Sequence, residues 1–495
     1  MTSLLGSFIS APSKAVSAIK KADKQHNQPR VEVNAMRPFQ IWRAVIIVSL
    51  LFAEWGLAYG LLDVMNYHVK VAMDVTRQEA AWLAFAYYAS YWPGTMLIGR
   101  PLVAKCGYRV AMFTGMLLVS GGMLGMSFGA AVCQLGGMVG AHFVIGLGVS
   151  TLESSANPYA VNCGPRKGAA LRILLGQTMA AVGTVVAPPL ASRFVFSPTS
   201  VQSVPVVNPD QPSTCLLTEA KGASCDALGT VIVFYRSLSG IVAAMAIVMA
   251  SIFFLTEWVP EIPVNPSPAT THKKWKMWEH PLFSMRFLRL WLGVAANATN
   301  LGCQVTFAQF FLEHMKVNAC LSEKGAANMM LVAQTLFTLG RVVASGLVAT
   351  GLKWRLGALK PRIILVGFLA GAVAFTMGSI WAKGTAAIGI STLVMFCESP
   401  SFPINFEMAT AQMDQWQASG ETAMILSVSG GGVMPLLNGL LSDQVGVANA
   451  WALTGGSFAI VLLFPLLVNA IPSWRKAVDE ANVEEKQAEE FEMEA

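Results

Sequence analysis

The chain has 495 residues, of which 54% are hydrophobic and only 13% are charged. Because soluble proteins carry about 25% charged residues, this composition excludes an ordinary soluble globular protein. The formal net charge of +6 reflects where Lys and Arg lie between apolar stretches, so it does not indicate a nucleic-acid-binding protein.

Apolar stretches of about 20 residues recur along the chain, and each is long enough to cross a bilayer about 30 Å thick. Backbone groups in lipid must be hydrogen-bonded within their own segment, so the spanning elements must be helices. We therefore predict an all-α membrane protein with twelve transmembrane helices. The predicted spans are residues 42–65, 80–102, 108–130, 134–157, 168–190, 229–256, 288–312, 326–349, 361–382, 385–406, 421–441 and 448–471.

The segments outside the spans indicate the orientation of the chain. Most of the 34 Lys and Arg residues fall on one side when the N-terminus is placed in the cytosol, and this bias predicts that both termini are cytosolic. The basic, Ser-rich tail 1–41 either lies on the membrane surface or targets the chain to an organelle. The acidic tail 473–495 is expected to be solvated. We expect the plasma membrane as the location, with an internal organelle membrane as the alternative.

An internal repeat relates the two parts of the chain. The polar loop 258–286 divides the spans into six and six. Span four contains ESSANP, which begins at Glu153, and span ten contains ESPSFP, which begins at Glu398. Because both motifs lie in the fourth span of six, we predict two duplicated six-helix halves, 42–257 and 287–472. This arrangement resembles the plan of the major facilitator superfamily, in which solutes bind near the membrane midplane between the halves.

Glu153 lies in a polar stripe of span four. The spacing i, i+3, i+4 and i+7 places four residues on one helix face: Ser150, Glu153, Ser154 and Asn157. Such a face points into the bundle or into a water-filled cavity. No Arg lies at matching depth in the neighbouring spans, so an ion pair that merely holds helices together is the less favoured alternative. A membrane carboxyl group that exchanges protons with a cavity is the basis of proton coupling.

Span one contains two acidic residues in opposite phase. Asp63 shares a helix face with Tyr59 and Asn66, and we predict that it faces the cavity. Glu54 lies nine residues earlier, half a turn out of phase, so both acids cannot point into one cavity. We expect Glu54 to snorkel towards solvent or to pair with an Arg near the cytosol.

Further polar residues are candidates for solute binding. Glu398 begins a stripe with Phe402 and Asn405 that either lines the cavity or contacts another helix. An aromatic face beside hydrogen-bonding side chains suits a sugar ring. Asn300 and Gln304 of span seven are costly to bury unpaired, which favours a wet cavity around them.

The cysteines and the absent motifs limit the chemistry. Cys215 and Cys225 fall in one predicted outside loop, where an oxidising exterior permits a disulfide between them, with Cys320 as an alternative partner. The sequence has no G-x-x-x-x-G-K-[ST] motif, no H-E-x-x-H motif and no Cys/His metal cluster. We therefore expect neither an enzyme nor an ATP-driven pump, and no metal or organic cofactor.

Several segments carry a family resemblance. They are WGLAYGLLD in span one, LESSANPYA in span four, the following LRILLGQT, and SFPINF and SGGGVMPLLNGLLSDQVG near the end. These segments look like the fucose permease branch of the major facilitator superfamily, most specifically at E-x-x-A-N-P in span four. The resemblance covers nearly all of the helical chain, and the tail and the loop between spans five and six look like those of a fungal member.

The resemblance implies roles for individual residues. In that family two cavity acids are linked to sugar binding and proton transfer, and they fall on Asp63 and Glu153 here. The family's glutamines of the fifth and seventh helices fall on Gln177 and Gln304, and an aromatic residue of the tenth helix falls on Phe402. Protons are the coupling ion that this resemblance implies.

The chain also departs from the family pattern. The Asn pair of the first helix is Tyr59–Gly60 here, the Asn of the fifth helix is Ala180, and the Trp of the seventh helix is Ala308. The loop between spans two and three has Ala104 where the superfamily motif often has Asp. The resemblance therefore implies retained proton chemistry with altered sugar contacts, and a sugar or small polar metabolite other than fucose.

We predict a monomeric, proton-coupled symporter that imports a monosaccharide-sized solute by rocking of its two halves, with the lipid bilayer as its other partner. Glu153 and Asp63 are the predicted proton-coupling acids. The residues assigned to solute binding are Tyr59, Asn157, Gln177, Asn300, Gln304, Glu398 and Phe402. One alternative is a proton-antiport exporter of a secondary metabolite or drug-like compound, which the 25 Met residues favour. The other is a non-transporting sensor or scaffold, which the membrane acids disfavour.

Overall fold

The computed structural model describes eight segments of the chain. They are residues 36–164, 169–195, 205–207, 215–217, 228–262, 285–354, 359–413 and 417–479. Most of the predicted N-terminal tail, central loop and acidic C-terminal tail lies outside these described residues, as does Cys225.

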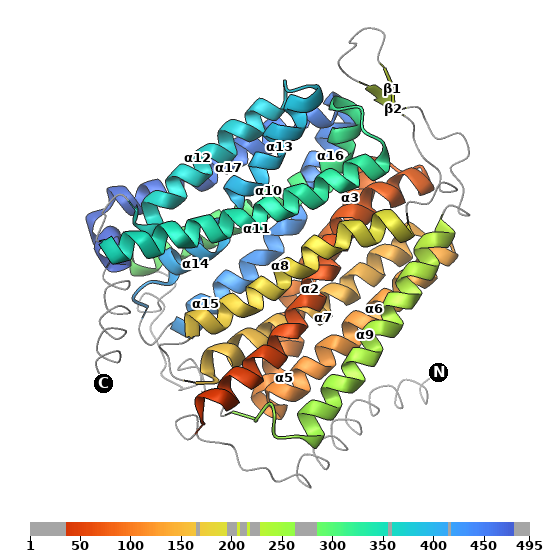
Figure 1. The fold of residues 1–495 in the computed structure, drawn as a ribbon. Helices are drawn as coiled ribbons and strands as arrows, with labels where there is room; N and C mark the ends of the chain where they lie inside the picture. The colour runs from red at the N-terminus through yellow and green to blue at the C-terminus, as the bar shows by residue number, and fades with distance from the viewer. Residues whose placement is uncertain are drawn as a thin grey trace, which may run out of the picture.

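The first group of helices follows chain order from α2 to α9 (Figure 1). Its long helices are α2 (Pro38–Met73), α6 (Tyr108–Ala131), α7 (Leu135–Asn162), α8 (Ala169–Phe194) and α9 (Gly229–Leu255). Between α2 and α6 the chain forms shorter consecutive segments: α3 (Arg77–Ala89), α4 (Tyr91–Pro93), the π-helical η2 (Gly94–Gly99) and α5 (Arg100–Cys106).

The second group runs from α10 to α17. Its continuous helices are α10 (Met285–Asn318), α11 (Glu323–Trp354), α12 (Pro361–Ser379) and α17 (Val447–Ala470). Its interrupted helices are α13 (Gly384–Glu398) with α14 (Ser401–Thr410), and α15 (Gln417–Leu426) with the 3-10 segment η9 (Ser427–Gly432) and α16 (Val433–Val445). Two short antiparallel strands, β1 (Pro205–Val207) and β2 (Cys215–Leu217), lie between α8 and α9 in the chain.

Nine helices within the described residues are long and apolar enough to cross a membrane. They comprise α2, α6, α7, α9, α11, α12 and α17, together with Gly384–Thr410 and Ser419–Val445, which run through the two interruptions. Helical segments also cover the other three predicted spans, as α3 to α5, α8 and α10. The prediction of a helical membrane protein that crosses the bilayer several times is therefore confirmed.

Two predicted spans are not continuous α-helices. α13 ends at Glu398 and α14 begins at Ser401, with Pro400 at the break. A proline ring removes a backbone N–H and clashes with the preceding turn, so it interrupts a helix. The run Ser427–Gly432 contains three consecutive glycines and winds as a 3-10 helix. Glycine destabilises the interior of an α-helix because it loses more conformational entropy than other residues, so regular α-helix is disfavoured here.

The same glycines set how closely the two groups approach each other. A Cβ atom on Gly431 would lie 2.8 Å from the Tyr88 ring, and one on Gly432 would lie 2.9 Å from the Cα atom of Phe85. Only a hydrogen at these positions lets η9 lie against α3 of the first group. Small residues of this kind let membrane helices approach each other closely.

Packing is extensive within each group and more limited between them. In the first group α2 packs along α8, and α6 packs against α7 and α9. In the second group α17 packs against α10 and α12, and α13 packs against α11 and α12. The groups meet where α3 contacts α16 and η9, where α8 contacts α11, and where α2 contacts α10 (Figure 1). Side chains on α2, α3, α10 and α11 are thereby positioned between the groups.

A capping box fixes the start of α3 at this junction. The Thr76 hydroxyl accepts a hydrogen bond from the Glu79 backbone N–H (3.1 Å), and the Glu79 carboxylate accepts one from the Thr76 N–H (2.9 Å). Such reciprocal bonds satisfy backbone donors that a helix start leaves unpaired. The cap holds Arg77, the first residue of α3, at a defined place between the groups.

Candidate functional site

Glu153 lies on α7 at the edge of a small pocket. Its side chain is buried, and the Tyr91 hydroxyl is its hydrogen-bond neighbour. The same hydroxyl accepts a hydrogen bond from the indole N–H of Trp55 (3.2 Å). No cationic side chain pairs with Glu153 among the described residues. The pocket is lined by Leu51, Phe52, Trp55, Leu152, Glu153 and Ala156.

The other polar residues of the α7 stripe face different surroundings. The hydroxyl groups of Ser150 and Ser154 donate to carbonyl groups three residues earlier in α7, each at 3.1 Å. Both serines pack against η2, because a Cβ atom on Gly94 would overlap the Ser150 hydroxyl oxygen and one on Gly99 would overlap that of Ser154. Asn157 is half-buried, and its side-chain oxygen has no hydrogen-bond partner among the described residues. The stripe therefore faces the bundle, and Asn157 extends it beyond Glu153.

Asp63 lies on α2 at the junction of the two groups and is fully buried. Neither of its carboxyl oxygens has a hydrogen-bond partner among the described residues, although buried polar groups are normally hydrogen-bonded. Tyr59, one turn earlier, interacts with it electrostatically. One turn later, Asn66 donates across the groups to Gln309 of α10 (3.5 Å). An acid without a partner at this junction is suited to binding a proton or a solute.

Glu398 and Arg341 lie on the opposite side of the same junction. Glu398 ends α13, is 1% exposed, and has no hydrogen-bond partner for either carboxyl oxygen among the described residues. Arg341 of α11 donates from Nε to the Ser399 carbonyl oxygen (3.1 Å) and lies over the Phe337 ring. Glu398 interacts electrostatically with both Asp63 and Arg341. The sequence prediction did not include Arg341, although a lone Arg within the apolar run TLFTLGRVVASGL is a usable signal.

The remaining predicted binding residues come from α8, α10 and α14. Asn300 is fully buried, and neither atom of its amide head has a hydrogen-bond partner among the described residues. Gln304, one turn later on α10, is also buried. Phe402 is half-buried on α14 with its ring 6.1 Å from that of Phe406, and Gln177 is half-buried on α8. Unsatisfied polar groups and aromatic rings are the features of sites for small polar ligands.

Glu54 does not behave as the sequence predicts. Its side chain is 4% exposed, and neither carboxyl oxygen has a hydrogen-bond partner among the described residues. Snorkelling and pairing with an Arg are therefore both wrong for this structure. The reason is that α2 is enclosed by α3, α7, α8 and α10. Ala58, Leu61 and Met65, which follow Glu54 on the same side of α2, are buried as well.

Four charged residues join the two groups near the α2–α3 loop. We call this end of the molecule the outer end, because the predicted topology places it outside the cell, and we call Lys70, Arg77, Glu313 and Asp443 the outer charge cluster. The buried carboxylate of Glu313 on α10 accepts hydrogen bonds from Lys70 Nζ and Arg77 Nη2, both at 2.7 Å. Arg77 also pairs with Asp443 of α16 at 3.2 Å. The outer charge cluster therefore holds the groups together at this end.

A second polar contact between the groups lies beside that cluster. The His68 Nδ1 atom of α2 is 3.4 Å from Oε1 of Glu323, the first residue of α11, and both side chains are 1% exposed. The Lys316 ammonium group of α10 lies 4.6 Å from the centre of the Tyr67 ring of α2. The outer end is thus closed by polar and charged contacts.

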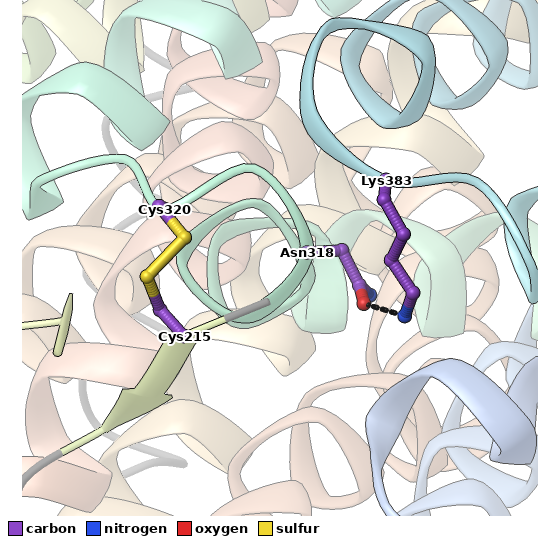
Figure 2. Close-up of a disulfide and its surroundings, with 4 residues drawn as sticks. All are labelled: Cys215, Asn318, Cys320 and Lys383. Carbon is purple, nitrogen blue, oxygen red and sulfur yellow. Dashed lines mark hydrogen bonds between the residues drawn. A yellow bond between two sulfur atoms is a disulfide. The ribbon is translucent and has the colours of Figure 1, made fainter. Parts of the chain in front are cut away.

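A disulfide ties β2 to the α10–α11 loop at the outer end. Cys215 is bonded to Cys320, with 5.4 Å between their Cα atoms (Figure 2). The predicted Cys215–Cys225 disulfide is therefore wrong in this structure, and the alternative partner is the one used. The physical reason is that β2 packs against α10, which brings Cys215 within disulfide range of the loop. Lys383 donates a hydrogen bond to Asn318 beside the bridge (Figure 2).

These features define the class of protein. Several membrane-crossing helices form two groups, and carboxyl and amide side chains without partners are buried between them, which is the architecture of a multi-pass membrane transporter. The sequence profile of the Major Facilitator Superfamily matches residues 44–420. The chain belongs to the Major Facilitator Superfamily.

Known transporters resemble this chain over most of its length. A glucose/galactose transporter of Brucella abortus is 23% identical over 429 residues, which cover 86% of this chain and 93% of the relative. The L-fucose-proton symporter of Escherichia coli is 22% identical over 421 residues, which cover 84% and 91%. The crystal structure of the fucose:proton symporter FucP of E. coli has the same fold, with a TM-score of 0.59, 20% identity, and 86% and 98% of the two chains covered. The resemblance to the fucose permease branch is thus confirmed.

Proposed function

We propose that the protein is a secondary active transporter that couples import of a monosaccharide-sized solute to protons. The observation that carries the proposal is the pair of buried acids Asp63 and Glu153, neither of which is hydrogen-bonded to a cationic side chain among the described residues. The relatives named as a glucose/galactose transporter and an L-fucose-proton symporter support a sugar as the solute and the proton as the coupling ion.

The transport cycle follows from the cost of burying charge. A carboxylate without a partner is far more costly to bury than a neutral carboxylic acid. Protonation of Asp63 and Glu153 from outside therefore favours a cavity that can bind solute and close behind it. When the cavity opens to the cytosol, the acids lose their protons to a compartment of lower proton activity, and solute release follows. The empty carrier then returns to its outward-open state.

Solute binding is proposed for polar and aromatic groups around the junction of the two groups. Asn300 has unpaired amide atoms, and Glu398 has unpaired carboxyl oxygens, so both have hydrogen-bonding capacity for sugar hydroxyl groups. An aromatic ring such as that of Phe402 can stack on the apolar face of a sugar. The residues proposed to contact the solute are Tyr59, Asn157, Gln177, Asn300, Gln304, Glu398 and Phe402.

The proposed arrangement in the membrane has twelve spans with both termini in the cytosol. The nine apolar helices account for nine of these spans, and α3 to α5, α8 and α10 are proposed to supply the other three. The halves would be residues 42–257 and 287–472, with cytosolic segments at 1–41, 258–286 and 473–495. We propose that the monomer is the transporting unit and that it works in the plasma membrane.

Sugar uptake into vesicles tests the proposal. The purified protein is reconstituted into liposomes, and uptake of radiolabelled D-glucose, D-galactose, L-fucose, other deoxyhexoses and amino sugars is measured with the outside made acidic. We expect accumulation of at least one sugar above its outside concentration, abolished by a protonophore. Uptake that never exceeds equilibration, whatever the pH gradient, would contradict proton coupling. Gradient-driven movement opposite to the proton flux would support the exporter alternative.

A further inference from the structure

One hydrogen bond between side-chain amides joins the two groups of helices beside Asp63. The Asn66 amide of α2 donates from Nδ2 to the Oε1 atom of Gln309 on α10, at 3.5 Å. Both side chains are buried. Because α2 and α10 belong to different groups, this contact forms only when the groups meet here. We call Asn66 and Gln309 the amide bridge.

The amide bridge lies between Asp63 and the outer charge cluster. Along α2, Asp63 precedes Asn66 by three residues and Lys70 follows it by four. Along α10, Glu313 follows Gln309 by four residues, and Lys70 donates to Glu313 at 2.7 Å. The two contacts are therefore successive rungs between the same two helices. Three residues of α-helix rise about 4.5 Å, so a solute that touches Asp63 can also reach the amide bridge.

The amide bridge leaves hydrogen-bonding capacity unused. The Oδ1 atom of Asn66 and the Nε2 atom of Gln309 are buried and have no hydrogen-bond partner among the described residues. A contact between two amides uses one oxygen and one amino group, so one oxygen and one amino group remain whichever way the amides are turned. Buried polar groups are normally hydrogen-bonded, so these free atoms indicate a place for a ligand with polar atoms of its own.

The free atoms fit one kind of ligand best. A hydroxyl group both donates and accepts, so two neighbouring hydroxyl groups can satisfy the bridge together, one donating to the Asn66 oxygen and the other accepting from the Gln309 amino group. A carboxylate only accepts and an ammonium group only donates. An apolar compound would leave both amides unpaired, and a site with unpaired polar groups rejects such a ligand.

We propose that the amide bridge binds a pair of adjacent hydroxyl groups on the solute and closes over them, so that Asn66 and Gln309 determine which solute is accepted. Neither residue is among those assigned to solute binding above. This inference rests on the proposed function, in which a monosaccharide-sized solute binds between the two groups of helices. It narrows that solute to a polyhydroxylated compound and disfavours an apolar, drug-like one.

Substitutions of similar shape remove the two amides one at a time. Asn66→Leu and Gln309→Met keep the approximate size of each side chain and delete its polar atoms. Asn66→Ala and Gln309→Ala provide a second replacement at each position, so the test does not depend on one variant folding. Asn438→Leu on α16 is the matched control, because Asn438 is a fully buried amide whose hydrogen bonds, to Ser442 (3.4 Å) and from Thr454 (3.5 Å), stay within the second group.

Thermal unfolding in detergent at increasing sugar concentration measures binding without transport, because a ligand of the folded state raises the unfolding temperature. The probes are D-glucose, D-galactose and L-fucose, followed by the monodeoxy analogues of each sugar that binds. We expect at least one probe to bind the unmodified protein. Analogues that lack either of two adjacent hydroxyl groups should bind at least about tenfold more weakly. Asn66→Leu and Gln309→Met should each weaken binding of the parent sugar to a similar extent, and Asn438→Leu should not.

The analogues distinguish a direct contact from a general disturbance of the site. In Asn66→Leu, loss of the hydroxyl group that Asn66 binds should cost no further affinity, whereas loss of its neighbour should still do so. Gln309→Met should show the reverse pattern. No binding of any probe, unchanged binding in both variants, or penalties for both deoxy analogues that persist in both variants would overturn the inference.

Vesicle uptake separates this inference from the proposed function. Uptake without proton coupling, beside the expected binding pattern, refutes the proposed function and leaves the sugar contact intact. Proton-coupled uptake beside unchanged binding in Asn66→Leu and Gln309→Met refutes the sugar contact and leaves the proposed function intact.

Discussion

At the scale of single residues, the surroundings of Glu153 explain how a carboxyl group can exist within a membrane helix. The acid faces a small pocket, and Tyr91 links it to the indole N–H of Trp55. The Tyr91 hydroxyl gives the carboxyl group a polar contact without a fixed counter-ion among the described residues. That combination leaves Glu153 able to gain and lose a proton.

Removal of the Tyr91 hydroxyl tests this link. Tyr91→Phe leaves the Trp55 N–H and one side of the Glu153 carboxyl group without a partner, at a cost of about 1–3 kcal/mol. We expect the initial rate of pH-driven uptake to fall by about tenfold, which corresponds to ~1.4 kcal/mol. Tyr88→Phe is the matched control, because the Tyr88 hydroxyl is buried without a hydrogen-bond partner among the described residues. Equal losses in both variants would argue against the link.

The sequence identified the acids more readily than their neighbours. Glu153, Asp63 and Glu398 stand out because each interrupts a long apolar run, and such residues are rarely exposed to lipid. Their partners depend on how distant helices pack, which helical spacing does not reveal. Arg341 is visible in the sequence as a lone charge in an apolar run, but its hydrogen bond to the residue after Glu398 depends on this packing. The burial of Glu54 depends on it as well.

At the scale of elements, hydrophobic length was a good guide to where helices occur and a poor guide to where they break. The interruption after Glu398 and the 3-10 segment η9 both lie inside stretches that are apolar enough to read as continuous spans. Pro and Gly mark both places in the sequence, but these residues also occur inside unbroken helices here, such as Pro158 in α7. The local break therefore depends on what each turn packs against.

The contact of η9 with α3 gives a prediction about glycine. In Gly432→Ala the new methyl group would lie 2.9 Å from the Phe85 Cα atom, and such overpacking typically costs about 1–3 kcal/mol. We expect a lower thermal unfolding temperature for this variant in detergent. Gly456→Ala on α17 is the control, since nothing lies within 4 Å of its Cβ position. A fall of the same size in both variants would show that the η9 contact is not the cause.

A charged contact at the other end of the second group gives a pH-dependent prediction. Asp479 accepts hydrogen bonds from Lys360 Nζ (2.6 Å) and Arg362 Nε (3.0 Å) at the start of α12. Burial alone would raise the pKa of Asp479, but the hydrogen bonds from Arg362 and Lys360 hold this pKa below its ordinary value. The contact therefore contributes stability above the ordinary Asp pKa of about 3.9 and loses it as the pH falls through the lowered pKa.

Substitution of that acid gives the expected size of the effect. Asp479→Asn should lower the free energy of unfolding by about 1 kcal/mol or less at pH 7, because the contact is partly exposed. The difference from the unmodified protein should shrink as the pH approaches 3. Thermal unfolding at several pH values measures this difference. Arg475→Gln is the control, because Arg475 is exposed and lies with Asp479 in the helical segment 472–479. A difference that is constant over this pH range would contradict the assignment.

At the scale of the whole molecule, the structure is held closed at one end. The outer charge cluster, the His68–Glu323 contact and the contacts of η9 with α3 all join the two groups of helices. The Cys215–Cys320 disulfide adds a covalent link from β2, between α8 and α9 in the chain, to the α10–α11 loop of the second group. Alternating access requires these noncovalent contacts to break each time the outer end opens.

Loss of the central carboxylate of the outer charge cluster should favour that opening. Glu313→Gln leaves Lys70 and Arg77 without the acceptor that binds both. We expect the population of the open outer end to rise by at least about tenfold, or ~1.4 kcal/mol. The measurement is the distance between nitroxide labels on Arg193→Cys and Gln444→Cys, at the ends of α8 and α16. Asp74→Asn is the control. Asp74 is an exposed acid in the α2–α3 loop, next to the outer charge cluster, and its backbone has a left-handed conformation that Asn also adopts. An unchanged distance in Glu313→Gln would contradict the gating role of the cluster.

The central claim is that proton binding at Glu153 drives uptake, and one substitution tests it most directly. Glu153→Gln mimics the protonated acid without the ability to exchange a proton. In liposomes, we expect this variant to exchange internal unlabelled sugar for external labelled sugar at a rate comparable to the unmodified protein. The same variant should fail to accumulate sugar when the outside is made acidic. Full gradient-driven accumulation by Glu153→Gln would contradict the account.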